Sequence, residues 1–65
     1  MKNPFVKVKD TDGGVSWINM NKVTEMWTSI KDSEKVTAID MEGYSETRYF
    51  ATDISNILEQ VYVNN

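Results

Sequence analysis

The sequence predicts a small α+β domain that is mainly β: about five short antiparallel strands in a strongly twisted, meander-like sheet, followed by one C-terminal amphipathic helix. Three observations support this fold class. Apolar and polar residues alternate through most of the first fifty positions, glycine-containing or polar turns separate the alternating runs, and the period changes to that of a helix after residue 52. A chain of 65 residues has room for one domain, spanning 1–65.

The first hairpin is the clearest element. Residues 5–9 (FVKVK) alternate, with Val6 and Val8 on one face, as in a half-buried strand. Residues 10–14 (DTDGG) follow, and their Asp-Gly pair suits the positive φ angles of a tight hairpin turn. Alternation resumes over 15–20 (VSWINM), which we expect to pair with the first strand.

The rest of the sheet is expected after a bend at residues 19–22, where two asparagines can bond to nearby backbone groups. A third strand is predicted over 23–30, and residues 31–35 (KDSEK) form a polar turn. The fourth and fifth strands are predicted over 36–41 and 44–51, joined by a turn at Glu42-Gly43.

The last segment has a helical period of apolar residues and a possible N-cap at Thr52 or Asp53. We expect its apolar stripe to cover the inner face of the sheet, with Leu58 as an anchor whose truncation to Ala costs about 2–5 kcal/mol. The predicted inward residues are Ile18, Met20, Met26, Ile30, Ile39 and Met41 from the strands, and Ile54, Ile57, Leu58 and Val61 from the helix.

Size and composition favour self-association. A domain of about 60 residues is marginally stable, and small domains are commonly reinforced by disulfides, metals or oligomerisation. The chain has no cysteine and no histidine, which excludes disulfides and the usual zinc site. We therefore expect a homo-oligomer, with a dimer favoured; the alternative is a core that needs no reinforcement.

Charge and hydropathy restrict the partners and the compartment. The net charge is −3 and the seven bases are scattered, so nucleic acid is not the expected partner and a protein is favoured. The longest apolar runs have three residues, too short for a membrane span or a secretory signal, and we expect a cytoplasmic protein.

The order of elements resembles two groups of proteins. Small flagellar proteins of the FlbD type are similar over nearly the whole length, and LytTR-type DNA-binding domains are similar over their first portion. The resemblance implies a fold and a regulatory or accessory role, and no functional residue is carried over from either group. Small proteins of phages and mobile elements fit the sequence equally well. It rests on Gly14, Ile18-Asn19, Val23, Met26, Gly43 and 54–58.

No motif predicts catalysis, a cofactor or a metal site. Counted from Asp10, the twelfth position of a calcium loop is Asn21 rather than Glu, so the segment is interpreted as a turn. Asp40 and Glu42, with Glu46 expected across the hairpin, are interpreted as solvated edge charges. A nucleophilic triad lacks its histidine, and we expect no enzyme activity.

The aromatic residues are the remaining candidates for function. Trp17, Trp27, Tyr44 and Tyr49 are candidate interface residues, with Tyr44 and Tyr49 expected on opposite faces of the fifth strand. The alternative is that the sheet curls and buries one tryptophan in a second, minor core. The expected function is a noncatalytic accessory or regulatory module that binds proteins and itself. The alternative is a reduced nucleic-acid-binding module related in fold to LytTR-type domains.

Overall fold

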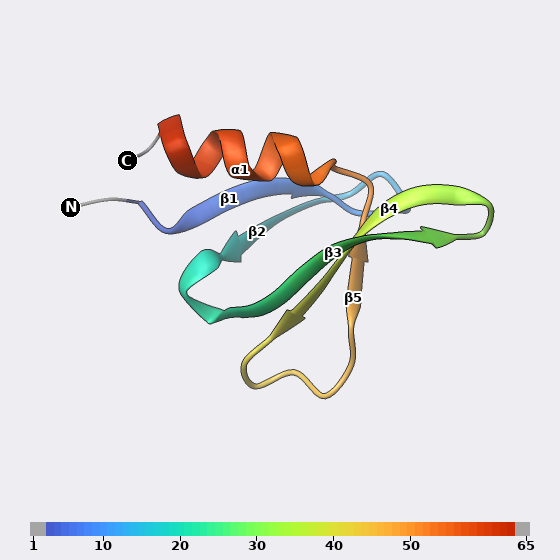
Figure 1. Ribbon diagram of the computed structural model, residues 1–65, viewed down its shortest axis with the longest axis horizontal. Helices are drawn as coiled ribbons and strands as arrows, with labels where there is room; N and C mark the ends of the chain where they lie inside the picture. Colours follow the sequence, from blue (N-terminus) through green and yellow to red (C-terminus); the bar gives the residue numbers. More distant parts are fainter. Residues whose placement is uncertain (1–2, 64–65) are drawn as a thin grey trace.

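A computed structural model describes residues 3–63 and confirms the α+β class, with five strands and a C-terminal helix (Figure 1). Just over half of the chain is in strands, and every strand pair is antiparallel. The elements are β1 (Phe5–Lys9), β2 (Val15–Asn19), the 3-10 helix η1 (Met20–Lys22), β3 (Val23–Lys31), β4 (Glu34–Met41), β5 (Arg48–Phe50) and α1 (Ile54–Val63).

The strands form two sheets rather than the single meander that alternation suggested. Strands β1 and β2 make one sheet, here called sheet A; strands β3, β4 and β5, in that order, make sheet B. The sheets meet at an isolated bridge between Asp10 and Phe50, and the Ala51 N–H donates to the Lys9 C=O at 2.7 Å. The strands are therefore arranged in the order β2-β1-β5-β4-β3, which leaves β2 and β3 at the two outer edges.

Two tight turns hold the hairpins, as the turn residues predict. In the first, Gly13 has φ +96°, and the Asp10 N–H donates to the Gly14 C=O at 2.7 Å. In the second, Asp32 and Ser33 have φ values of 52° and 66°, the left-handed pair that a two-residue hairpin loop of type I′ requires. This turn is shorter than the predicted segment 31–35, so β3 and β4 extend almost to its tip.

The bend between the sheets is the short helix η1. Its N-cap is Asn19, whose Oδ1 accepts a hydrogen bond from the Asn21 N–H at 2.9 Å. The predicted bond from an asparagine side chain to the nearby backbone is confirmed here. The 3-10 turn redirects the chain from sheet A to sheet B.

The core lies between the two sheets and α1. Its fully or nearly fully buried members are Val6, Val8, Ile18, Ile39, Met41, Phe50 and Ile57, and Met20, Val23, Met26 and Val61 pack against them. The inward positions predicted for β2 and β4 are confirmed, as is the contribution of α1, and Val6 and Val8 of β1 join them in the core. The helix runs back along β1, and its first turn is fixed because the Asp53 C=O accepts from the Asn56 and Ile57 amides.

Two predicted core residues are not buried. Ile57, with no exposed surface, anchors α1, whereas Leu58 is 38% exposed. The stripe of α1 is therefore centred on Ile57 and Val61, and the helix turns Leu58 toward its flank. Ile30 is 67% exposed because the β3–β4 hairpin extends beyond the core (Figure 1).

The last strand is also shorter than predicted. Only Arg48–Phe50 pairs with β4, and residues 44–47 form an irregular loop after Gly43, whose φ is +89°. Tyr44 therefore lies in this loop and not on β5 opposite Tyr49. The Thr47 hydroxyl donates to Asp40 Oδ1 at 2.5 Å, which ties the loop to β4.

Candidate interaction surface

Trp27 and Tyr49 cover a minor cluster on the outer face of sheet B. The register aligns Trp27, Ala38 and Tyr49 across β3, β4 and β5, on the face opposite Met26 and Ile39. Ala38 is fully buried although it faces away from the main core.

A contact across the sheet explains this burial. The Lys31 Nζ lies 4.5 Å from the centroid of the Tyr49 ring, although the two residues are on the strands that flank β4. Because strands in a sheet are about 4.8 Å apart, side chains from β3 and β5 can meet only by passing over β4. They thereby cover Val36 and Ala38, and Trp27, 38% exposed, borders them. Trp27 and Tyr49 are thus partly engaged within the fold.

Trp17 and Tyr44 have a different environment from that of Trp27 and Tyr49. Trp17 is 61% exposed and Tyr44 58% exposed, and both line a groove of about 290 Å³ together with the half-exposed ring of Phe5. Trp17 is on β2, Phe5 is on β1 opposite Asn19, and Tyr44 comes from the loop before β5. The fold thus brings together three aromatic side chains that are far apart in sequence.

Basic side chains border the same groove. Lys22 and Arg48 line it, and Arg48 lies with its guanidinium carbon 5.4 Å from the centroid of the Tyr44 ring, a cation–π distance. Glu42 is also in the lining, with its Oε1 4.0 Å from the Lys22 Nζ. Both partners of that ion pair are largely exposed, so the pair contributes little to stability.

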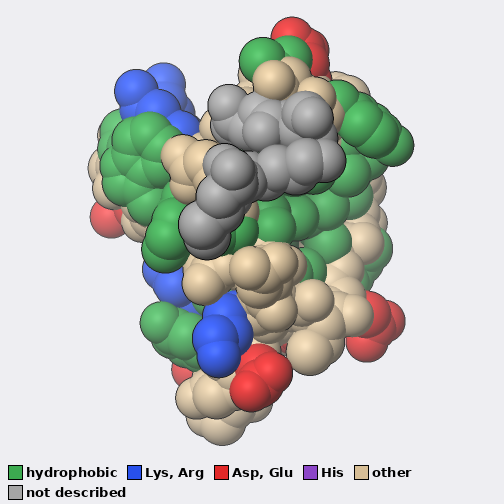
Figure 2. All heavy atoms as spheres, turned by 90° about the vertical axis from the view of Figure 1, so that its left-hand side faces the viewer, with side chains coloured by type: hydrophobic (Ala, Val, Ile, Leu, Met, Phe, Trp, Pro, Cys, Tyr) green, Lys and Arg blue, Asp and Glu red, His purple; other side chains and the backbone are tan. Residues whose placement is uncertain are grey.

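The space-filling view from the side of η1 and the chain ends shows hydrophobic, basic and acidic side chains interspersed along the left-hand margin (Figure 2). Lys7 lies on the same face of sheet A as Trp17, because the two are directly opposite each other in the β1–β2 register. Cross-strand partners in an antiparallel pair lie on the same face. We call the groove lined by Phe5, Trp17, Asn19, Lys22, Tyr44 and Arg48 the β2 groove.

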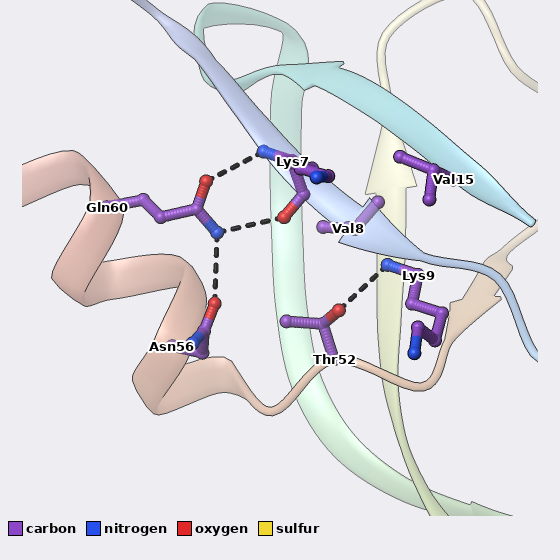
Figure 3. Close-up of a pocket in the computed structure, with 7 residues that line it drawn as sticks. All are labelled: Lys7, Val8, Lys9, Val15, Thr52, Asn56 and Gln60. Atoms are coloured by element: carbon purple, nitrogen blue, oxygen red, sulfur yellow. Dashed lines mark hydrogen bonds between the residues drawn. The ribbon is translucent and has the colours of Figure 1, made fainter.

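A second hollow, of about 410 Å³, separates β1 from α1, but its polar groups already bind one another (Figure 3). The Lys7 N–H donates to Gln60 Oε1 and the Gln60 Nε2 donates to the Lys7 C=O, both at 2.8 Å. The Lys9 N–H donates to the Thr52 hydroxyl at 2.8 Å. Gln60 also donates to Asn56 Oδ1 at 3.0 Å. These contacts satisfy the edge of β1 that faces away from β2.

The carboxylates predicted to be edge charges are not assembled into a catalytic pair. Asp40 accepts the Thr47 hydroxyl, and Glu42 points toward Lys22. Within residues 3–63, no group of three or more acidic residues is arranged to hold a metal ion. In the same part of the chain, no helix has both the length and the apolar composition that crossing a bilayer requires.

Sequence reasoning identified Trp17 and Tyr44 but missed Phe5, Lys22 and Arg48. Phe5 shares the exposed face of its strand with Lys7 and Lys9, and this pattern indicates a solvent-exposed face and not a binding site. These three residues come together at the groove only in the folded protein, because the chain turns back after η1 and again after Gly43. A scan against models of known protein families finds no match, and searches of curated proteins and of solved structures find none either.

Proposed function

We propose that this protein is a noncatalytic, cytoplasmic interaction module that binds proteins, including a second copy of itself, through the β2 groove. The observation that supports this most strongly is the gathering of Phe5, Trp17 and Tyr44 around one groove, with Trp17 and Tyr44 more than half exposed and Phe5 43% exposed. Tyrosine, tryptophan and arginine are enriched among the residues that contribute most of the binding energy at protein interfaces.

Self-association has an additional motive in the size of the core. The main buried cluster holds seven side chains in a chain without disulfides. Cores of this size typically supply only about 3–5 kcal/mol. A two-fold contact of the β2 groove would bury Trp17 and Tyr44 against their own copies, and a dimer is the simplest closed assembly.

The test is the molar mass across a concentration series, measured by light scattering. Trp17→Ser should weaken the dimer, whereas Ile30→Ser should not, because Ile30 is equally exposed but lies at the tip of the β3–β4 hairpin. A monomer mass at every soluble concentration would exclude self-association. A dimer that Trp17→Ser leaves intact would exclude the β2 groove as its contact.

A nucleic-acid-binding function is the second candidate, and one observation favours it. The β2 groove combines aromatic rings with Lys22 and Arg48, and Lys7 is on the same side. Sites for single-stranded nucleic acid combine stacking rings with a basic track. Titration with an oligothymidylate, followed by tryptophan fluorescence in a Trp27→Phe variant that keeps Trp17, tests this function. Binding that weakens steeply between low and high salt would support it, since phosphate contacts release counterions.

A further inference from the structure

Three of the strand edges in this fold are protected against pairing. The outer edge of β1 is occupied by Gln60 and Thr52, and β5 is tied to β1 by the bridge at Phe50. The free edge of β3 carries the charged residues Glu25 and Lys31, and its register shifts between Val23 and Glu25. Charged side chains, bulges and covering side chains are the devices by which natural sheets prevent edge-to-edge pairing.

Among residues 3–63, none of these devices is found at the outer edge of β2. The backbone N–H and C=O of Lys7 both bind Gln60, so they point away from β2. In an antiparallel ladder, when the backbone groups of one residue point away from the partner strand, those of the residue directly opposite do so too. The N–H and C=O of Trp17, opposite Lys7, therefore point away from β1. The same holds for Val15 and Asn19, two residues away on either side. No strand in the described part of the chain pairs with this edge.

The sequence of β2 is also that of an unprotected edge. Val15–Asn19 (VSWIN) contains no charged residue, no proline and no glycine, and its pairing with β1 continues without a shift in register. Three consecutive residues of β2, Trp17 through Asn19, line the β2 groove. Successive side chains of a strand point to opposite faces, so the groove is bordered by residues from both faces of β2, as at a strand edge.

The charge around this edge favours an acidic occupant. Lys22 and Arg48 line the groove, against Glu42 as the one acid in its lining, although the whole chain has a net charge of −3. Charge complementarity of this kind selects partners and accelerates their encounter.

We infer that the open edge of β2 binds an extended, acidic peptide segment of a partner protein, which adds to sheet A as a third strand. Main-chain hydrogen bonds to Val15, Trp17 and Asn19 supply affinity, and the aromatic rings of the groove receive every second side chain. The inference rests on the proposed function, because both use the β2 groove.

The experiment uses the full chain labelled with ¹⁵N, at a concentration where it is monomeric, and a capped heptapeptide of sequence Glu-Val-Glu-Phe-Glu-Val-Glu. Binding should slow amide hydrogen exchange at Val15, Trp17 and Asn19 by about tenfold or more at saturation, and should leave Thr28 on β3 unchanged. The control peptide has lysine in place of each glutamate and should bind about tenfold more weakly or not at all.

Two further comparisons separate strand addition from simple charge attraction. One variant peptide is N-methylated on its glutamates and a second on its apolar residues. Because only alternate amides of the added strand face β2, one of these peptides should bind about tenfold more weakly and the other should bind as tightly as the unmethylated peptide. Lys22→Glu should weaken binding by about threefold or more, because Lys22 lines the groove, and the matched variant Lys35→Glu, near the hairpin tip, by less than about twofold.

Several results would overturn the inference. They are equal binding of the lysine peptide, equal effects of the two N-methylations, or protection that appears at Thr28. Tighter binding of an oligothymidylate at the same amides would assign the groove to nucleic acid. Protection of Trp17 that grows with protein concentration and without peptide would assign the edge to a second copy. That last result would leave the proposed function standing, whereas failure of the peptide, the second copy and the oligothymidylate together would remove both.

Discussion

Gln60 should stabilise the fold chiefly by occupying the edge of β1, and its truncation tests how this protein protects its sheets. Its side-chain amide makes two hydrogen bonds with the backbone of Lys7, each 2.8 Å long, and a third with Asn56 at 3.0 Å. Gln60→Ala removes all three and keeps the helical backbone, since alanine is the best helix former.

The expected cost follows from these bonds. Each hydrogen bond contributes about 0.5–1.5 kcal/mol net, and the Lys7 backbone can bind water once Gln60 is shortened, because the site is exposed. We therefore expect Gln60→Ala to lower the free energy of unfolding by about 1–2 kcal/mol. For a domain of this size that corresponds to a fall in Tm of about 4–16 °C.

Thermal unfolding followed by circular dichroism measures this loss, and amide exchange measures its location. The Lys7 amide should exchange much faster in Gln60→Ala, whereas Gln60→Glu should show an intermediate loss. A carboxylate can still accept from the Lys7 N–H, but it has no N–H to donate to the Lys7 C=O. The exposed neighbour Glu59 provides the control, and Glu59→Ala should change stability by less than about 0.5 kcal/mol.

The reasoning would be refuted if Gln60→Ala were as stable as Glu59→Ala and if Lys7 exchanged at its original rate. Light scattering gives a second readout. Because Gln60→Ala opens a second strand edge, it should increase association relative to the original chain. Unchanged association combined with a lower Tm would show that Gln60 supports the fold without guarding the edge.

The remaining predictions concern the core, one turn and the two tryptophans. Ile57→Ala should destabilise by about 2–5 kcal/mol and Leu58→Ala by less than about 1.5 kcal/mol, since only Ile57 is fully buried; equal losses in urea titrations would contradict this packing. Ser33→Gly should stabilise by about 0.5–1 kcal/mol in thermal unfolding, because glycine relieves the positive φ of 66°, and a loss of stability would argue against the type I′ turn. Trp27→Ser should destabilise by about 1–3 kcal/mol, since it uncovers the minor cluster, and Trp17→Ser by less than about 1 kcal/mol; the reverse order in urea titrations would exclude this assignment.

Local sequence determined the elements of this fold. Alternation in FVKVK placed Val6 and Val8 in the core, the Asp-Gly pair before Gly14 made the first turn, and the change of period after Thr52 placed the helix. These signals depend on residues a few positions apart, so the chain expresses them without help from distant segments. The same signals identified Trp17 and Tyr44 as candidates without locating their surroundings.

Tertiary structure decided how the elements combine. The division into two sheets depends on the bend at η1 and on the bridge between Asp10 and Phe50, contacts that no local pattern encodes. Ile57 rather than Leu58 became the anchor because the angle at which α1 lies along β1 selects which part of its apolar stripe is buried. The sequence likewise did not predict that the outer edge of β1 is covered and that the outer edge of β2 is open. A glutamine more than fifty residues from Lys7 closes one of them, and nothing in the described chain closes the other.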